Sequence, residues 1–377
     1  MKEATVSVAV RTGDNGLQVG RPALKSVGPI TFGPDGILFV ADNAAATIFA
    51  IDLQDAEEPR ETRPINVEGL DTRLAAYLGC PRESVVIRDM AVHPSSENVY
   101  LSVMRGTGSD AIPLLIKVDR EGTLSEVSLE DVPFSQTAIK SPAVESSEWA
   151  EALPGRGREG DGTDPGADVK ARIVADRRHT VAVTDLAYVD GVLLVAGSSN
   201  EEFASTLRRI PFPFSGDALS NSLEIYHVSH SRYETAAPIR TFMPYGGNTS
   251  ILASYTCTPV VHFSLSDIQS GTQLKGRTVA ELGSGNTPIG IVSYKRDGEE
   301  YLLISNTKHP LLKIACNDVD RQEGLTQPKE PRGVPREELP HPGVSHMANL
   351  NGSYVVMMQQ EEVGGSLNLR SYSNASL

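Results

Sequence analysis

Three side chains that could bind a divalent metal ion, or serve as an acid and a base, occupy one equivalent position of an internal repeat. They are Asp89, Asp185 and His346, each directly before the first apolar residue of its copy. Carboxylate and imidazole groups are common metal ligands, and burial can separate their pKa values enough for acid and base roles. A second interpretation stays open for each. The Asp side chains can simply accept hydrogen bonds from backbone N–H groups of a neighbouring element, and His346 can be a non-catalytic channel residue.

The repeat that contains these residues has two apolar runs joined by a tight turn. Its six copies cover residues 29–42, 88–103, 184–197, 241–255, 289–305 and 346–359. Five of the turns contain Asp-Gly, Asn-Gly or Gly-Gly, which tolerate the positive φ angles of hairpin turns. Six β-hairpins at similar spacing are typical of a β-propeller. We therefore predict an all-β fold, a six-bladed β-propeller with four-stranded antiparallel blades.

A propeller of this size can be one domain, so residues 1–377 are expected to form a single unit. The predicted blades cover residues 27–70, 85–130, 181–230, 238–282, 286–330 and 341–375. The segment 61–68 is expected to be the outer strand of blade 1. Residues 4–10 are expected to complete the last blade and close the ring. Between blades we expect a short helical insertion at 71–84 and a long polar insertion loop at 133–180, which contains the only tryptophan, Trp149.

In an antiparallel hairpin the start of the first strand lies beside the end of the second, so both reach one mouth of the central channel. Alignment of the copies predicts a ring of residues at this mouth: Pro29, Asp89, Asp185, Thr241, Gly290 and His346. The two carboxylates are expected to lie on adjacent blades, and the imidazole is expected to lie opposite one of them. Further polar residues predicted at the mouth are Asp42, Asn43, Arg88, Arg105, Thr184, Asn200, Arg240, Thr256, Asn306 and Gln359.

A second cluster precedes blade 4 and is expected to open onto the same rim. It consists of His227, His230, Arg232, Tyr233 and Glu234. The H-x-x-H spacing is one residue short of a helical zinc pair, and no H-E-x-x-H occurs, so a hydrogen-bonded loop is favoured over a metal site.

The formal net charge is -14, which argues against nucleic acid and anionic membranes as partners. No transmembrane segment and no signal peptide is recognisable. Cys80, Cys257 and Cys316 form no C-x-x-C pair, so neither zinc nor redox chemistry is indicated, although one disulfide between two of them is possible.

The stretch GPDGILFVADNAAATIFAID at 33–52 resembles the strand pairs of NHL, YVTN and SMP-30/gluconolactonase-like propellers. Residues 199–214, 231–245 and 255–263 resemble a group of exported bacterial propeller proteins, which implies a periplasmic or extracellular location. SMP-30-like enzymes hold one divalent metal ion in the channel with a Glu, an Asn and an Asp, and typically show Asn-Gly-Leu before the first turn. That tripeptide does not start any inner strand here, so lactonase chemistry does not transfer to particular residues.

Two functions follow as hypotheses. The first is a binding module that presents its polar channel mouth to a small molecule or a protein, because a strong scaffold pattern accompanies no complete catalytic motif. The second is a metal-dependent, lactonase-like hydrolase or a lyase, with a divalent cation such as calcium held by Asp89, Asp185 and His346.

Overall fold

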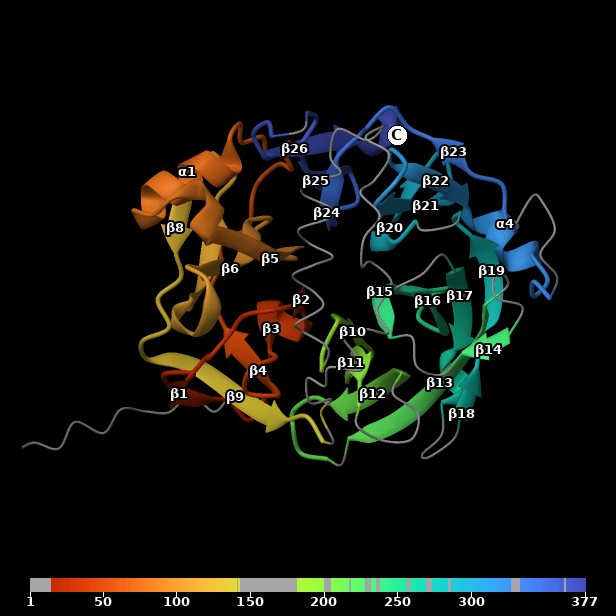
Figure 1. The fold of residues 1–377 in the computed structure, drawn as a ribbon. Helices are drawn as coiled ribbons and strands as arrows, with labels where there is room; N and C mark the ends of the chain where they lie inside the picture. Colours follow the sequence, from red (N-terminus) through yellow and green to blue (C-terminus); the bar gives the residue numbers. More distant parts are fainter. Residues whose placement is uncertain are drawn as a thin grey trace, which may run out of the picture.

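The predicted six-bladed β-propeller is confirmed. The computed structural model describes residues 15–140, 142, 182–199, 205–216, 218–227, 232–234, 238–255, 259–268, 273–283, 286–326, 333–362 and 364–377. Six antiparallel sheets surround a central axis in these parts of the chain (Figure 1). We number the sheets as blades 1 to 6 in chain order. The expected closing strand at 4–10 and Trp149 lie outside the described residues.

Each blade has three successive strands that lie side by side, with the first strand nearest the axis and the third farthest from it. The inner strands are β2 (Ile30–Phe32), β5 (Val85–Val92), β10 (Asp185–Val189), β15 (Ile239–Tyr245), β20 (Pro288–Arg296) and β24 (Val344–Leu350). The second strands are β3 (Ile37–Asp42), β6 (Val99–Arg105), β11 (Val192–Ser198), β16 (Ser250–Tyr255), β21 (Glu299–Asn306) and β25 (Tyr354–Gln359). The third strands are β4 (Thr47–Asp52), β7 (Ile112–Val118), β12 (Ser205–Pro211), β17 (Pro259–Ser264), β22 (Leu312–Ala315) and β26 (Asn368–Ser373).

The outer edges of the blades differ more than their inner parts. Their strands are β9 (Val132–Ala138) and β1 (Gln18–Gly20) in blade 1, β8 (Leu124–Glu126) in blade 2, β13 (Leu219–His227), β14 (Arg232–Glu234) and β18 (Gln273–Lys275) in blade 3, β19 (Arg277–Glu281) in blade 4 and β23 (Glu337–Glu338) in blade 5. β18 pairs in parallel with β13, although it belongs to the connection between β17 and β19 of blade 4.

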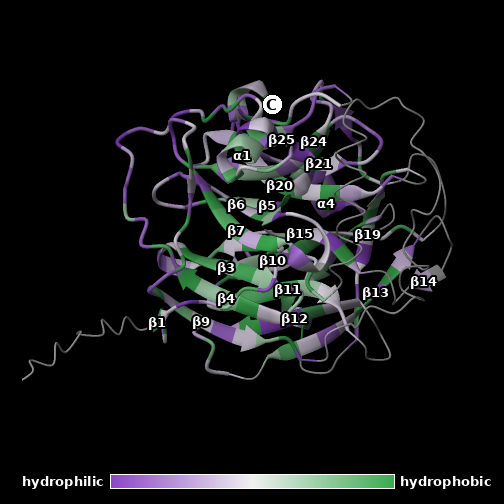
Figure 2. Ribbon diagram, turned by 60° about the vertical axis from the view of Figure 1, so that its left-hand side comes forward, coloured by the Kyte–Doolittle hydropathy of each residue, from purple (hydrophilic) through white to green (hydrophobic). Residues whose placement is uncertain are grey.

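The turn residues explain why the inner hairpins form. Asp35, Asp190, Asp297 and Asn351 all have positive φ angles, and each is followed by a glycine that also has a positive φ. Apolar side chains alternate along the strands and pack between neighbouring sheets, as the layer of Leu207, Leu223 and Ile251 does between blades 3 and 4. Figure 2 shows hydrophobic residues concentrated in the strands and hydrophilic residues in the connections.

The blades do not follow chain order around the axis. β2 of blade 1 lies between β5 of blade 2 and β10 of blade 3, and β24 of blade 6 lies against β5. Around the ring the order is therefore blade 2, 1, 3, 4, 5 and 6 (Figure 1). The prediction that Asp89 and Asp185 lie on adjacent blades is therefore wrong, because blade 1 lies between blades 2 and 3.

Two exchanged segments produce this order. β9 follows blade 2 in the chain but pairs with β4 of blade 1, so the outer edge predicted for 61–68 is occupied by β9, from the start of the predicted loop at 133–180. The 61–68 segment instead reaches blade 6, where Val67 exchanges two backbone hydrogen bonds with Leu369 of β26, at 2.8 and 2.9 Å. Backbone hydrogen bonding is the same at every sheet edge, so a strand pattern alone does not specify which edge a segment joins.

The connection from β4 to Val67 passes the inner turn of blade 2 and is held there by side chains. Asp55 Oδ2 accepts hydrogen bonds from Ser96 Oγ, Asn98 Nδ2 and Tyr100 Oη at 2.7, 2.8 and 2.6 Å. Further along, Thr62 Oγ1 donates to Glu97 Oε1 at 2.5 Å. These contacts fix the crossing between blades 1 and 6.

A short helix follows this crossing, as predicted for 71–84. α1 (Leu70–Leu78) ends at Gly79, which has φ 62°, and Asp71 pairs with Arg82 at 2.5 Å. A second short helix, α4 (Cys316–Arg321), follows β22. Within the described ranges, no helix is long and apolar enough to span a membrane.

Candidate functional site

A central cavity of about 330 Å³ runs between the inner strands of all six blades. Five members of the predicted ring line it, namely Asp89, Asp185, Thr241, Gly290 and His346, whereas Pro29 does not. Further along the strands Met90, Phe242, Ile291 and Met347 are among the lining residues, but their side chains are buried and pack in the apolar layers between blades. The fold therefore brings ring residues that are up to 257 positions apart in the chain to one cavity, as the alignment of the repeat predicted.

A recurring β-bulge explains how the ring residues reach the channel. The register shifts between Ile87 and Asp89, Ile239 and Thr241, Pro288 and Gly290, and Val344 and His346. The extra residues at these four bulges are Arg88, Arg240, Ile289 and Ser345. A bulge redirects the side chains that follow it and increases the local twist. The ring position is thus the first residue after the bulge in four of the blades.

The two carboxylates bind backbone groups of a neighbouring blade. Asp89 Oδ2 accepts the N–H of Ile30 on blade 1, and Asp185 Oδ2 accepts the N–H of Phe242 on blade 4, both at 2.8 Å. Each Oδ1 accepts the N–H of the next residue in its own strand, also at 2.8 Å. These contacts match the structural interpretation of the two aspartates, and they hold both carboxylates in one orientation at the channel wall.

His346 makes an equivalent contact from blade 6 to blade 2. Its Nε2 lies 3.3 Å from the backbone oxygen of Arg88, and its Nδ1 lies 3.2 Å from Ser345 Oγ. A carbonyl oxygen only accepts hydrogen bonds, so Nε2 carries a proton in this arrangement. His346 is adjacent to blade 2, which carries Asp89, and lies across the ring from Asp185 of blade 3, because three blade steps separate blades 6 and 3 in either direction.

Two other predicted mouth residues also join blades. Thr184 Oγ1 donates to the backbone oxygen of Ile239 at 2.6 Å, linking blade 3 to blade 4. Asn43 exchanges two hydrogen bonds with the backbone of Val183, at 2.8 and 3.1 Å, linking blade 1 to blade 3. Neither residue lines the cavity, so their contacts support the ring rather than the channel surface.

Three predicted mouth residues at the ends of second strands are buried, namely Asp42, Asn306 and Gln359. Asp42 is fully buried and accepts backbone N–H groups of Lys25, Ser26 and Ala45. Gln359 donates to the backbone oxygen of Pro342 at 2.8 Å. Arg105 is exposed, Arg240 is buried, and Asn200 and Thr256 lie outside the described residues. The polar side chains of Asp42 and Gln359 thus bind backbone groups of neighbouring loops.

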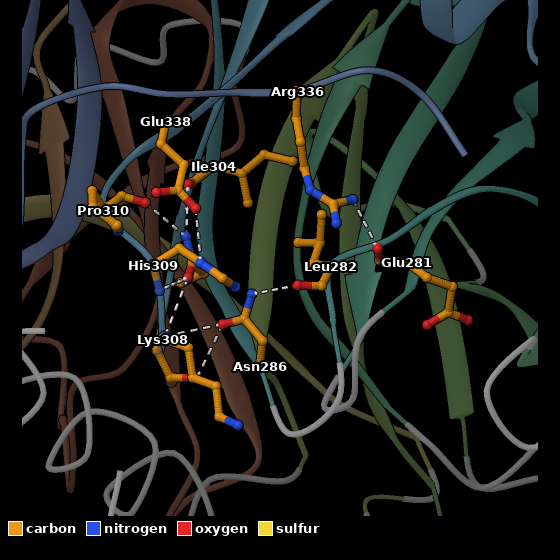
Figure 3. Close-up of polar contacts among 11 residues, drawn as sticks. Glu281, Leu282, Asn286, Ile304, Lys308, His309, Pro310, Arg336 and Glu338 are labelled. Atoms are coloured by element: carbon orange, nitrogen blue, oxygen red, sulfur yellow. Dashed lines mark hydrogen bonds and ion pairs between the residues drawn. The ribbon is translucent and has the colours of Figure 1, made fainter. Parts of the chain in front are cut away.

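Figure 3 shows a hydrogen-bond network between blades 4 and 5 that contains Asn286, Lys308 and His309. Asn306 belongs to the same network. It accepts the N–H of His309 at 2.7 Å and donates to the oxygen of Pro310 at 3.1 Å. Asn286 accepts the N–H of Lys308 at 3.0 Å and donates to the oxygen of Leu282 at 3.0 Å. Both amides are fully buried, and their bonds fix the loop after β21.

The described members of the second predicted cluster belong to β13 and β14 at the outer edge of blade 3 and are not among the residues that line the channel. His227 ends β13 and is fully buried, with Nε2 at 3.9 Å from Glu281 Oε2. Tyr233 lies in β14, is 56% exposed, and has the Lys275 ammonium 4.9 Å above its ring. Arg232 and Glu234 are the end residues of β14, and His230 lies outside the described residues.

Among the described residues, no group of three His, Cys, Asp or Glu side chains is arranged to hold a metal ion. Cys80 and Cys316 are free, and Cys257 lies outside the described part of the chain. The metal site predicted from Asp89, Asp185 and His346 therefore stays a prediction.

Ser345 and Asn349 line the channel and were not selected from the sequence. Ser345 occupies the bulge position that Arg88 and Arg240 occupy in their blades, so the same alignment shifted by one residue would have found it. Asn349 lies three residues beyond the ring position and donates to the backbone oxygen of Ser293 at 2.9 Å. No motif marks it.

Comparison with known proteins shows similarity to solved propellers at low identity. No protein-family model and no curated protein matches the sequence. The chain is similar to the β-propeller domain of Cps50 (Swd1) from Myceliophteria thermophila, with 12% identity, 92% of this chain and 83% of that chain covered, and a TM-score of 0.39. It is also similar to a streptogramin B lyase, with 10% identity, 95% and 97% coverage and a TM-score of 0.38. The chain is similar to U3-55K as well, with 10% identity, 94% of this chain and 98% of that chain covered, and a TM-score of 0.38.

Proposed function

We propose that this chain is a binding protein that holds a small molecule in its central channel. The observation that carries the proposal is the cavity of about 330 Å³ that the inner strands of all six blades line. Ligand sites are concave, mostly apolar and furnished with a few polar groups, and they begin at about 300 Å³. The volume of the channel and the polar ring at its mouth fit this description.

The fixed orientation of the polar groups supports binding. The carboxylates of Asp89 and Asp185 are held by backbone N–H groups of two blades each, so a ligand would meet oriented acceptors without first having to order them. The Thr241 side chain adds a hydroxyl at the same level of the channel. The channel therefore suits a compact ligand that carries hydrogen-bond donors at one end.

A channel-filling variant tests this function. Ala348 lines the cavity and also packs against the apolar core between blades 2 and 6, so Ala348→Phe would change the channel wall at this point. The experiment is a thermal-shift screen of the purified protein against a small-molecule library, with direct calorimetry of the compounds that raise its Tm. Binding of these compounds should be lost in Ala348→Phe and weakened about tenfold in Thr241→Val, which removes a hydroxyl at almost constant volume. Ala44→Phe, at an exposed loop position, is the matched control and should bind normally.

Other outcomes would point elsewhere. Compounds that bind Ala348→Phe as well as the wild type would overturn the channel as the site. Capture of a protein at the rim that is insensitive to Ala348→Phe would favour a protein-binding module. The metal-dependent hydrolase is the remaining alternative, and stoichiometric divalent metal that is lost in both Asp185→Ala and His346→Ala, with the fold intact, would favour it.

A further inference from the structure

A second cavity, of about 810 Å³, lies between blades 1 and 2 at the outside of the ring. Three chain segments line it, namely 21–25 after β1, 112–115 at the start of β7 and 126–130 from the end of β8. No residue of the described chain lines both this cavity and the central channel. The cavity is therefore a separate candidate site, on the side of the ring where Figure 1 labels β1 and β8.

The exchange of β9 between the two blades explains why space remains here. β8 pairs with residues 116–118 of β7, and the chain then leaves blade 2 and pairs as β9 with β4 of blade 1. The first residues of β7 therefore face the cavity, and the crossing segment 126–130 forms one of its walls.

Partly exposed apolar side chains line the cavity. Leu24, Val127 and Leu129 are half-buried and pack against the apolar core between blades 1 and 2, to which Leu115 belongs. Ile112 is 47% exposed. Such side chains retain apolar surface that a bound molecule can remove from water, which favours association. The lining therefore favours a ligand that is mainly apolar.

Hydrogen bonds hold the walls in place. The Lys25 N–H donates to Asp42 Oδ2 at 2.6 Å, and Asp42 is fully buried. On the crossing segment, the Val127 N–H donates to the backbone oxygen of Leu115 at 2.9 Å. A preformed cavity binds a ligand without the entropy cost of ordering its walls.

The charged side chains at the rim balance each other. Arg21 and Lys25 lie on one segment, and Glu126 and Glu130 lie on another. Arg21 Nη1 is 3.0 Å from Glu130 Oε1, so an ion pair joins the two segments. A singly charged ligand would meet as many like charges as opposite ones, and it would also have to lose part of its hydration. The rim therefore favours a ligand without a net charge.

We propose that this cavity binds a neutral, mainly apolar small molecule between blades 1 and 2. Its volume lies within the usual range for ligand sites, about 300 to 1,000 Å³. The balanced charges and the partly exposed apolar side chains define the chemical class. The site is independent of the central channel and does not rest on the function proposed for it.

Nile red, a neutral apolar dye whose fluorescence rises in apolar surroundings, tests the site in the full-length protein. The wild type should bind the dye saturably. Ile112→Asp places a charge in the cavity wall and should weaken binding at least about tenfold. Val19→Asp is the matched control and should bind normally, because Val19 is 62% exposed and is not a lining residue. Both replaced side chains are exposed, so both variants should fold, which circular dichroism checks.

Thiol protection locates the bound dye. Ile112→Cys should be alkylated about tenfold more slowly when Nile red is present at about ten times its Kd. Val19→Cys should be alkylated at the same rate with and without the dye. Peptide mapping separates both positions from the half-buried native Cys80.

Four results would overturn the proposal. They are the absence of saturable dye binding by the wild type, unchanged binding by Ile112→Asp, equal weakening by Val19→Asp, and tighter binding of the anionic dye anilinonaphthalene sulfonate than of Nile red. Loss of dye binding in Ala348→Phe but not in Ile112→Asp would place the dye in the central channel. That result would overturn the second site while supporting the function proposed for the channel.

Discussion

Asp185 Oδ2 accepts the backbone N–H of Phe242 at 2.8 Å, so a side chain of blade 3 binds the inner strand of blade 4. Asp89 makes the same bond, at the same length, from blade 2 to Ile30 of blade 1. Ile30 and Phe242 are equivalent positions of the repeat, as are the two aspartates. Hydrogen bonds at the channel mouth therefore also join neighbouring blades. The two aspartates have this structural role whether or not a ligand binds.

Removal of the Asp185 carboxylate should destabilise the fold. Asp185→Ala leaves the N–H groups of Phe242 and Leu186 without their acceptor, and we expect a loss of about 1 to 3 kcal/mol in the free energy of unfolding. Asp185→Asn keeps one acceptor oxygen and should lose less. Asp190→Asn, an exposed turn residue of the same blade that tolerates positive φ, is the control. Urea unfolding measures all three, and equal stability of Asp185→Ala and the control would contradict the role of the hydrogen bond.

Asp55 should be the most sensitive position of the crossing connection. Asp55→Ala removes the acceptor of three hydrogen bonds and leaves the buried Tyr100 hydroxyl unpaired, which should cost about 2 to 4 kcal/mol of stability. Tyr100→Phe removes only one donor and should cost about 1 kcal/mol. In a double-mutant cycle the two losses should not add, since they share one bond. Additive losses would show that Asp55 acts through other contacts.

Two glycines at equivalent turns should respond differently to alanine. Gly36 and Gly191 both follow an Asp and have φ 72° and 85°, so alanine costs about 1 kcal/mol at either site from backbone strain alone. A Cβ at Gly36 would lie 2.3 Å from His93 Nε2, whereas a Cβ at Gly191 would meet no atom within 4 Å. Gly36→Ala should therefore lose about 1 to 3 kcal/mol more than Gly191→Ala in chemical denaturation. The additional loss should shrink in a His93→Ser background.

Stability should fall as the pH drops below 6.5. Burial lowers the pKa of His93, His262 and His341 from the ordinary value of 6.5, so the folded protein favours their neutral forms. The stability that the neutral histidines contribute is fully present above pH 6.5. It is lost as the pH falls from 6.5 through the lower pKa values of the folded protein, because the unfolded chain takes up protons first. Each histidine can add up to about 1.4 kcal/mol per pH unit within that window. Denaturation at pH 8 and pH 5 tests the trend, and His93→Asn should reduce the slope.

A second loss of stability should appear below pH 3.8. Burial alone would raise the pKa of Asp55, but hydrogen bonds from Tyr100, Asn98 and Ser96 together lower it below its ordinary value of 3.8. The stability that Asp55 contributes is therefore present above pH 3.8 and is lost as the pH falls further. Asp55→Asn should abolish this second loss of stability. The histidine-dependent loss of stability near pH 6 should remain, which separates the two effects in a measurement of the free energy of unfolding against pH.

The repeat determined the blades and the position of the ring residues. Alternating apolar runs and turn pairs such as Asp35-Gly36 act within a few residues, so hairpins form wherever the pattern occurs. Because every blade repeats the same geometry, alignment placed Asp89, Asp185 and His346 along one channel. The bulges at Arg88, Arg240 and Ser345 were not visible in the pattern, since a bulge requires only one extra residue and no particular side chain.

Only the tertiary structure decided the order of the blades and the partners of their outer strands. β9 and residues 65–69 are strand-like wherever they lie, and every sheet edge offers them the same N–H and C=O groups. Their choice depends on contacts made far along the chain, such as those of Asp55 with Tyr100 and of Val67 with Leu369. Those contacts placed blade 1 between Asp89 and Asp185, an arrangement that local sequence, acting over a few residues, does not specify.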